Sequence, residues 1–195
     1  MKAELPASII KRGLESAASD FVSIAEIGQF AGKRRFDSHI FDVKPKEDQV
    51  KCALYRAFVD DGYLVHVEAG YITPYDTGRC DLIAVKDDYR IAIEIKTAWA
   101  GGGWVNKSEE QARSWHRDVS KIETLIMEKL IDSGVFVLCF IYECACTAEY
   151  LIRDKISEIF KAESDPLIQE VILNHWNGLN RMEFFVLNVM PSDAT

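Results

Sequence analysis

The sequence lacks any apolar run long enough to cross a membrane, and its N-terminus lacks the apolar core of a signal peptide. The longest apolar run, VFVLCFIY at residues 135–142, has the length of a strand, whereas a membrane-spanning helix needs about 20 apolar residues. Internal repeats and low-complexity linkers are also missing. We therefore expect a cytoplasmic protein without a membrane segment, folded as a single domain over residues 1–195.

A disulfide framework is missing as well. The five cysteines are odd in number and scattered, and most lie in apolar segments, as reduced core cysteines do. Cys144 and Cys146 form the only close pair, and without a second pair they do not predict a zinc site. His66 and His116 have no ligand spacing to other His or Cys residues, so we interpret both as structural or surface groups.

The chain has no general positive field, because its formal net charge is −8. Any nucleic-acid binding must therefore come from local patches. The basic run of Lys33, Arg34 and Arg35 offers one such patch, although a solvated surface charge run is the simpler interpretation. A group of carboxylates that binds divalent cations would itself lower the net charge.

Hydrophobic periodicity predicts a helix, three strands, a helix, a strand, a further helix and two final strands. The tight connection KDDYR predicts a β-hairpin between the second and third strands. The order predicts an α/β fold with a mixed sheet flanked by helices. Helices are expected over residues 5–20, 47–61 and 107–131, the last with Leu130 on its inner face, and around residues 151–160; a loop is expected over 31–45; strands are expected in YLVHVEAGY, RCDLIAV, IAIEIK, VFVLCFIYE, EVILNH and MEFFVLNVM.

Three charged residues interrupt the second and third strands, which are otherwise apolar. Side-chain alternation places Glu94 and Lys96 on one face, about 6.5 to 7 Å apart, and hairpin pairing can bring Asp81 beside Glu94 on the face of Ile83. Two buried acids repel unless a positive charge lies between them, and a divalent metal ion is the simplest such charge. Glu47, in line with the apolar stripe of the preceding helix, can join them. A structural Glu94–Lys96 ion pair, with Asp81 capping a turn, is the alternative.

The run from Glu47 through EDQVKCALYRAF, GYLVHVE, GRCDLIAV and IAIEIK resembles the core of the PD-(D/E)xK nuclease superfamily, which has the restriction-endonuclease-like fold. Members of the superfamily carry an α-β-β-β-α-β core with an Asp in the second strand, an Asp/Glu-x-Lys in the third and often a Glu in the first helix. The resemblance covers about residues 45–143, with 1–44 and 144–195 as flanking helices and strands. Cys80 stands where the name-giving Pro would be, and many similar sequences also lack that Pro.

The resemblance implies a Mg²⁺-dependent nuclease in which Mn²⁺ can substitute, acting on DNA rather than RNA. Asp81, Glu94 and the backbone carbonyl of Ile95 would hold the ion, with Glu47 as an additional ligand. Lys96 would orient or activate the attacking water and offset charge developing on the phosphate, so Asp81, Glu94 and Lys96 are the expected catalytic residues. A homodimer would suit the cutting of both strands of a duplex.

The glycine-rich stretch GGGWVNKS, residues 101–108, supports two interpretations. It matches the P-loop spacing G-x-x-x-x-G-K-[ST] except that Asn106 replaces the second Gly, whose missing side chain lets backbone N–H groups face a phosphate. We favour a loop at the mouth of the active site, with a plain connection as the alternative. The candidate nucleic-acid contacts are Trp104, Asn106, Lys107, Gln111, Lys121, Lys33, Arg34 and Arg35.

Two other functions stay open on sequence grounds. A non-catalytic nucleic-acid-binding or assembly subunit on the same fold would use the acidic residues structurally. A nucleotide hydrolase using residues 101–108 would lose nucleotide binding on Lys107→Ala and keep it on Lys96→Ala.

Overall fold

The computed structural model describes residues 6–30, 47–73, 77–100, 108–142, 169–175 and 178–189, which form helices and strands joined by short turns and unassigned segments. The expected order of helix, three strands, helix and strand runs from α2 to β4. The elements are α1 (Ala7–Phe30), α2 (Glu47–Asp60), β1 (Leu64–Ile72), β2 (Thr77–Lys86), β3 (Tyr89–Ala100), α3 (Ser108–Met127), β4 (Ser133–Tyr142), β5 (Gln169–His175) and β6 (Gly178–Val189).

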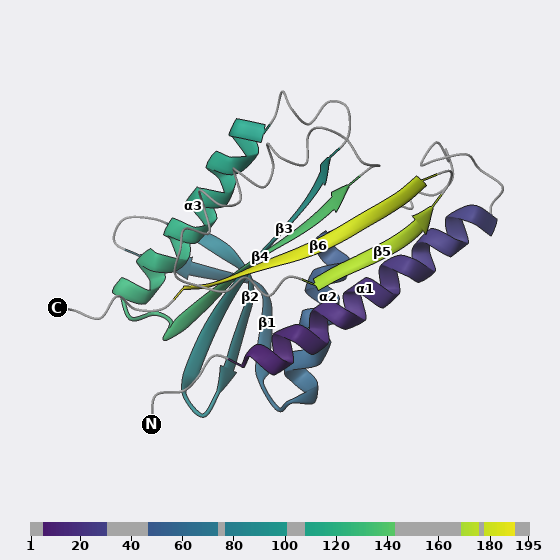
Figure 1. Cartoon of the computed structure of the whole chain (residues 1–195). Helices are drawn as coiled ribbons and strands as arrows, with labels where there is room; N and C mark the ends of the chain where they lie inside the picture. The colour runs from purple at the N-terminus through teal and green to yellow at the C-terminus, as the bar shows by residue number, and fades with distance from the viewer. Residues whose placement is uncertain are drawn as a thin grey trace.

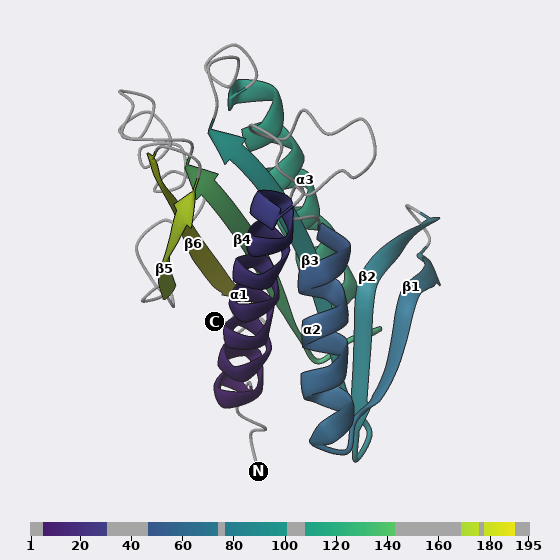
Figure 2. The same cartoon turned by 90° about the vertical axis from the view of Figure 1, so that its right-hand side faces the viewer.

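The six strands form one mixed sheet in the order β1-β2-β3-β4-β6-β5. β3 and β4 are parallel, and the other neighbouring strands are antiparallel. α1 and α2 lie side by side on one face of the sheet and α3 covers the other (Figures 1 and 2). The predicted α/β fold with a mixed sheet flanked by helices is therefore confirmed.

The apolar core has two halves, one on each face of the sheet. Ile91, Ile93 and Ile95 of β3 are fully buried in the half beneath α1 and α2. Ala92 and Ala98 of the same strand pack in the half beneath α3. This alternation is the one that the sequence predicts for a central strand covered on both sides.

Turns with positive φ set the ends of two elements. Gly62 (φ 84°) ends α2, where the N–H of Tyr63 donates to the carbonyl of Phe58 at 3.0 Å in a Schellman motif. Asp87 (φ 51°) and Asp88 (φ 65°) form the predicted tight connection between β2 and β3, in the left-handed backbone conformation that a two-residue hairpin turn requires.

Two predicted helix boundaries are wrong. α1 continues to Phe30 rather than residue 20, and fully buried Phe21 extends its apolar stripe beyond the expected end. α3 ends at Met127 because Lys129 (φ 57°) begins a second Schellman turn. Leu130 is consequently out of phase with the helix and 37% exposed, while Leu125 occupies the inner face.

Some expectations fall on parts of the chain outside the described residues. These are the loop over 31–45, the glycine-rich loop that begins at residue 101, and the amphipathic helix around 151–160. Among the described residues, none of the helices combines the length and apolar character that a membrane crossing needs.

A substitution at Gly134 would test how closely α3 packs on the sheet. A Cβ at Gly134 would lie 2.1 Å from Cγ2 of Ile122, whereas a Cβ at Gly70 would have no neighbour within 4 Å. We expect Gly134→Ala to lower the free energy of unfolding by about 1–3 kcal/mol, as overpacking does, and Gly70→Ala to change it by less than about 0.5 kcal/mol. Urea denaturation measures both, and equal effects would contradict the packing described.

Candidate functional site

The side chain of Asp81 lies where β2 and β3 separate. The two strands pair in register from Lys86↔Tyr89 to Leu82↔Ile93. Beyond that pair, Oδ2 of Asp81 accepts a 2.8 Å hydrogen bond from the backbone N–H of Ile95. The carboxylate thus accepts from a backbone N–H that would otherwise pair with a carbonyl of the neighbouring strand. It lies against the peptide that joins Glu94 to Ile95.

Side-chain alternation along β2 shifts by one residue at Asp81. Cys80 and Ile83 both pack on the α3 side of the sheet, although residues three apart in a regular strand point to opposite faces. Leu82 packs on the α1 and α2 side. The expectation that Asp81 shares the face of Ile83 is therefore wrong, because its carboxylate lies between the strands and is reached from α2.

Lys51 of α2 is the residue that reaches Asp81. It is 8% exposed, and its Nζ lies 2.8 Å from Oδ1 of Asp81 and 4.0 Å from Oδ1 of Asp48. The same ammonium group donates to the carboxylate of Glu68 in β1. Burial by itself would lower the pKa of Lys51, but the hydrogen bonds to Asp81 and Glu68 outweigh burial and raise it. Lys51 therefore carries a positive charge inside a ring of carboxylates.

Glu94 faces α3 and is almost completely buried, with 2% exposure. Nζ of Lys121 lies 2.6 Å from its Oε1 and donates to the carbonyl of Arg79 at 3.0 Å. Burial raises the pKa of Glu94 to about 7, against the lowering effect of Lys121. The negative charges of Asp81 and Asp118 also raise it, so Glu94 and Asp81 interact electrostatically.

Lys96 contacts acids from both α2 and α3. Its Nζ lies 3.5 Å from Oδ2 of Asp118 in α3 and 3.9 Å from Oε2 of Glu47 in α2. Burial raises the pKa of Glu47, and the positive charge of Lys96 partly offsets this effect. Glu94 and Lys96 both contact α3, as alternation along β3 predicts. The structure therefore brings Glu47, Asp81, Glu94 and Lys96 into one polar network.

Carboxylates outnumber lysines in this polar network. A surplus of hard oxygen donors suits Mg²⁺, which proteins commonly hold through one or two carboxylates together with waters and substrate phosphates. No group of three or more His, Cys, Asp or Glu residues within the described part of the chain is arranged to hold a metal ion. Asp81 and Glu94 supply carboxylate oxygens, which are the chemical type of donor that Mg²⁺ takes. The polar network consists of the carboxylates of Asp48, Glu68, Asp81, Glu47, Glu94 and Asp118 and the lysines Lys51, Lys96 and Lys121.

The sequence interpretation missed Lys51 and Glu68 as members of the site. Lys51 follows Glu47 by one helical turn and precedes Leu54 and Phe58 on the buried face of α2, so the same periodicity could have found it. The spacing Asp-x-x-Lys is a second signal, since it occurs at Asp48 and Lys51 in α2 and again in α3. The sequence contains no comparable signal for Glu68, because its contact with Lys51 depends on the backbone conformation of β1.

Cys80, in the place of the name-giving Pro, is a buried thiol next to the site. It is 1% exposed and packs with the apolar residues beneath α3. Burial, followed by the negative charge of Glu94, raises the pKa of Cys80 to about 12. The thiol therefore stays protonated at neutral pH and does not supply a thiolate ligand.

Most of the predicted nucleic-acid contacts lie outside the described residues, namely Trp104, Asn106, Lys107, Lys33, Arg34 and Arg35. Of the two that are described, Lys121 points to Glu94 and its side chain is only 18% exposed. Gln111 lies in the first turns of α3, and its Oε1 is buried without a hydrogen-bond partner in the described part of the structure. The contact roles of all these residues remain predictions, as does the ligand role of the Ile95 carbonyl.

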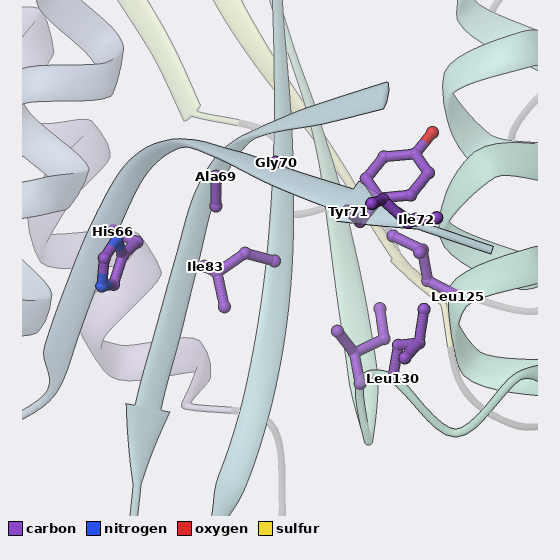
Figure 3. Close-up of a pocket in the computed structure, with 9 residues that line it drawn as sticks. His66, Ala69, Gly70, Tyr71, Ile72, Ile83, Leu125 and Leu130 are labelled. Carbon is purple, nitrogen blue, oxygen red and sulfur yellow. The ribbon is translucent and has the colours of Figure 1, made fainter. Parts of the chain in front are cut away.

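An apolar pocket lies between the strands β1 and β2 and the C-terminal end of α3 (Figure 3). His66, Tyr71, Ile83, Leu125 and Leu130 are among the residues that line it. None of the charged residues of the polar network lines this pocket. The pocket is therefore separate from the candidate site.

Comparisons with known proteins do not identify the chain. No protein-family model matches it, and no curated protein matches it. A solved structure described as "Crystal structure of SSO0001" is similar at 13% sequence identity, with 81% of this chain and 86% of that chain covered and a TM-score of 0.27. A likeness of this strength carries no argument about fold or function, so the candidate site depends on its own geometry.

The titration of Glu94 tests the electrostatics of the site in metal-free protein. We expect the carboxyl carbon of Glu94 to titrate by NMR near its pKa of about 7, and Lys121→Met to raise that midpoint because Lys121 stabilises the charged form. A carboxyl whose folded pKa exceeds its ordinary value destabilises the fold as pH rises from the ordinary value to the folded one. Glu94→Gln should therefore remove a loss of stability between about pH 4.5 and 7. A wild-type midpoint near 4.5 would contradict the described burial.

Proposed function

We propose that the protein is a Mg²⁺-dependent nuclease that hydrolyses phosphodiester bonds, with DNA as the expected substrate. The observation that carries the proposal is the hydrogen bond from the N–H of Ile95 to Asp81. It holds the carboxylate of β2 against the segment Glu94-Ile95-Lys96 of β3, where a nuclease of this kind needs both acids and the lysine. The contact between Glu47 and Lys96 adds the helical acid to the same place.

Asp81, Glu94 and the carbonyl of Ile95 would hold the Mg²⁺ ion, with Glu47 as an additional ligand. Their oxygens are of the kind that Mg²⁺ prefers. When bound, the ion would polarise a phosphodiester and lower the pKa of a water molecule. Mn²⁺ prefers the same donors and would substitute.

Lys96 would act on the attacking water and on the phosphate. Its ammonium group lies between carboxylates of α2 and α3, and its side chain is 27% exposed, so it is accessible to a substrate. Its positive charge would orient the water and offset the negative charge that develops on the phosphate during in-line hydrolysis. Asp118 and Glu47 position the ammonium group from opposite sides.

A second candidate function is a non-catalytic nucleic-acid-binding or assembly subunit on the same fold. The observation that favours it is the pairing of both central acids with lysines, Asp81 with Lys51 and Glu94 with Lys121. Such pairs can be purely structural. Homodimer formation and a cytoplasmic location belong to either proposal and rest on the sequence alone.

Cleavage assays separate the two candidates. Plasmid, linear duplex and single-stranded DNA, and RNA, are incubated with the protein in Mg²⁺, in Mn²⁺ and in EDTA. We expect cleavage of DNA that requires the divalent ion. Binding of nucleic acid without cleavage in any of these conditions would favour the subunit.

Two substitutions test the assigned residues. Lys96→Ala should lower the cleavage rate by about 10²–10³-fold, the usual effect of losing one stabilising donor. Asp81→Asn keeps an oxygen that accepts the hydrogen bond from Ile95 but loses the charge, so it should abolish cleavage while circular dichroism stays unchanged. Lys11→Met is the control, because it removes one charge at an exposed pair of α1. Full activity of Lys96→Ala would overturn its assignment.

A further inference from the structure

Each of the two acids assigned to the metal is paired with a lysine from a different helix. Lys51 of α2 lies 2.8 Å from Oδ1 of Asp81, and Lys121 of α3 lies 2.6 Å from Oε1 of Glu94. α2 and α3 cover opposite faces of the sheet (Figure 2). The two acids are therefore contacted by lysines from opposite faces. Mg²⁺ requires oxygens at about 2.1 Å, and an oxygen in such a short contact with an ammonium group cannot also approach a cation of the same sign without repulsion.

Each lysine also has another carboxylate within reach. Lys121 lies 3.7 Å from Oδ1 of Asp118, three residues earlier in α3. Lys51 lies 4.0 Å from Oδ1 of Asp48, three residues earlier in α2, and also contacts Glu68. A small rotation of either side chain would therefore exchange one carboxylate for another, and the ammonium group would not be left buried without a counter-charge.

We propose that Lys51 and Lys121 are internal counter-ions that occupy the metal-binding oxygens of Asp81 and Glu94 until a divalent cation displaces them onto Asp48, Glu68 and Asp118. This inference rests on the proposed function and adds a control of metal affinity to it. Lys51 and Lys121 are positioning residues, because neither contacts the reacting atoms. The apparent affinity for the cation is then the intrinsic affinity reduced by the work of moving the lysines.

Direct measurement of Mn²⁺ binding tests the proposal without any activity assay. Free Mn²⁺ is measured by electron paramagnetic resonance in titrations of wild type, Lys121→Met, Lys121→Arg and Lys11→Met, at about pH 8.5, where few carboxyl groups carry protons. Coupling between two bound groups typically amounts to about 5–150-fold in affinity. We therefore expect Lys121→Met to bind Mn²⁺ at least about fivefold more tightly than wild type.

The other variants serve as matched controls. Lys121→Arg keeps a positive charge in the same place, so its affinity should stay closer to the wild-type value than that of Lys121→Met. Lys11→Met removes the same unit charge from a helix, but at a side chain that is 59% exposed and lies 4.0 Å from Glu15. It should bind Mn²⁺ with the wild-type affinity, which separates the local effect from the change in net charge.

A measurement on the wild-type protein covers the case in which Lys121→Met fails to fold. The side-chain ¹⁵Nζ signals of the lysines are followed by NMR during addition of Mg²⁺. We expect the signals of Lys51 and Lys121 to shift with one common midpoint, while the signal of Lys86, which is paired with Asp61 away from the network, does not move. Unchanged signals of Lys51 and Lys121 in metal-saturated protein would overturn the displacement.

The outcomes separate this inference from the proposed function. Tighter Mn²⁺ binding by Lys121→Met, with unchanged binding by Lys11→Met, supports the counter-ion role. Equal or weaker binding by Lys121→Met overturns that role and leaves the metal-dependent nuclease in place. If neither wild type nor any variant binds Mn²⁺, the metal site itself is wrong, and both proposals fail.

Discussion

The hydrogen bond between the Asp81 carboxylate and the N–H of Ile95 is the interaction on which the arrangement of the site depends. It replaces a backbone hydrogen bond between β2 and β3 at the point where these strands separate. The N–H of Ile95 therefore keeps a hydrogen-bond partner. At this point Lys51 of α2 contacts Asp81, and Lys96 of β3 contacts acids of both α2 and α3. Hydrogen bonding and strand geometry thus make room for a polar site within an otherwise apolar sheet.

The second constraint is electrostatic, because buried carboxylates must be compensated or protonated. α2 and α3 each supply one lysine and, three residues before it, one aspartate. These pairs lie on the two faces of the sheet, and each lysine offsets the charge of one central carboxylate, Lys51 that of Asp81 and Lys121 that of Glu94. The burial that raises the pKa of Glu94 also strengthens any interaction of the site with a cation. The same carboxylates and lysines therefore affect both the stability of the fold and the proposed chemistry.

Local patterns predicted the fold well where a single periodicity governed a segment. The isoleucines of β3 alternate as expected, and Gly62 and the two turn aspartates lie where their backbone preferences predict. The prediction failed at the C-terminal end of α3. Leu130 continues the helical spacing in sequence, yet the Schellman turn at Lys129 removes it from the helix.

The sequence by itself determined the α/β class and the placement of Glu94 and Lys96 on one face, because strand alternation and helical periodicity are local properties. Only the tertiary structure decided which charges meet. Alternation could not reveal the shift at Asp81, where the carboxylate accepts a hydrogen bond from the neighbouring strand. Nor could it pair Lys51 with Asp81 or Lys121 with Glu94, because those contacts depend on how two helices pack on opposite faces of the sheet.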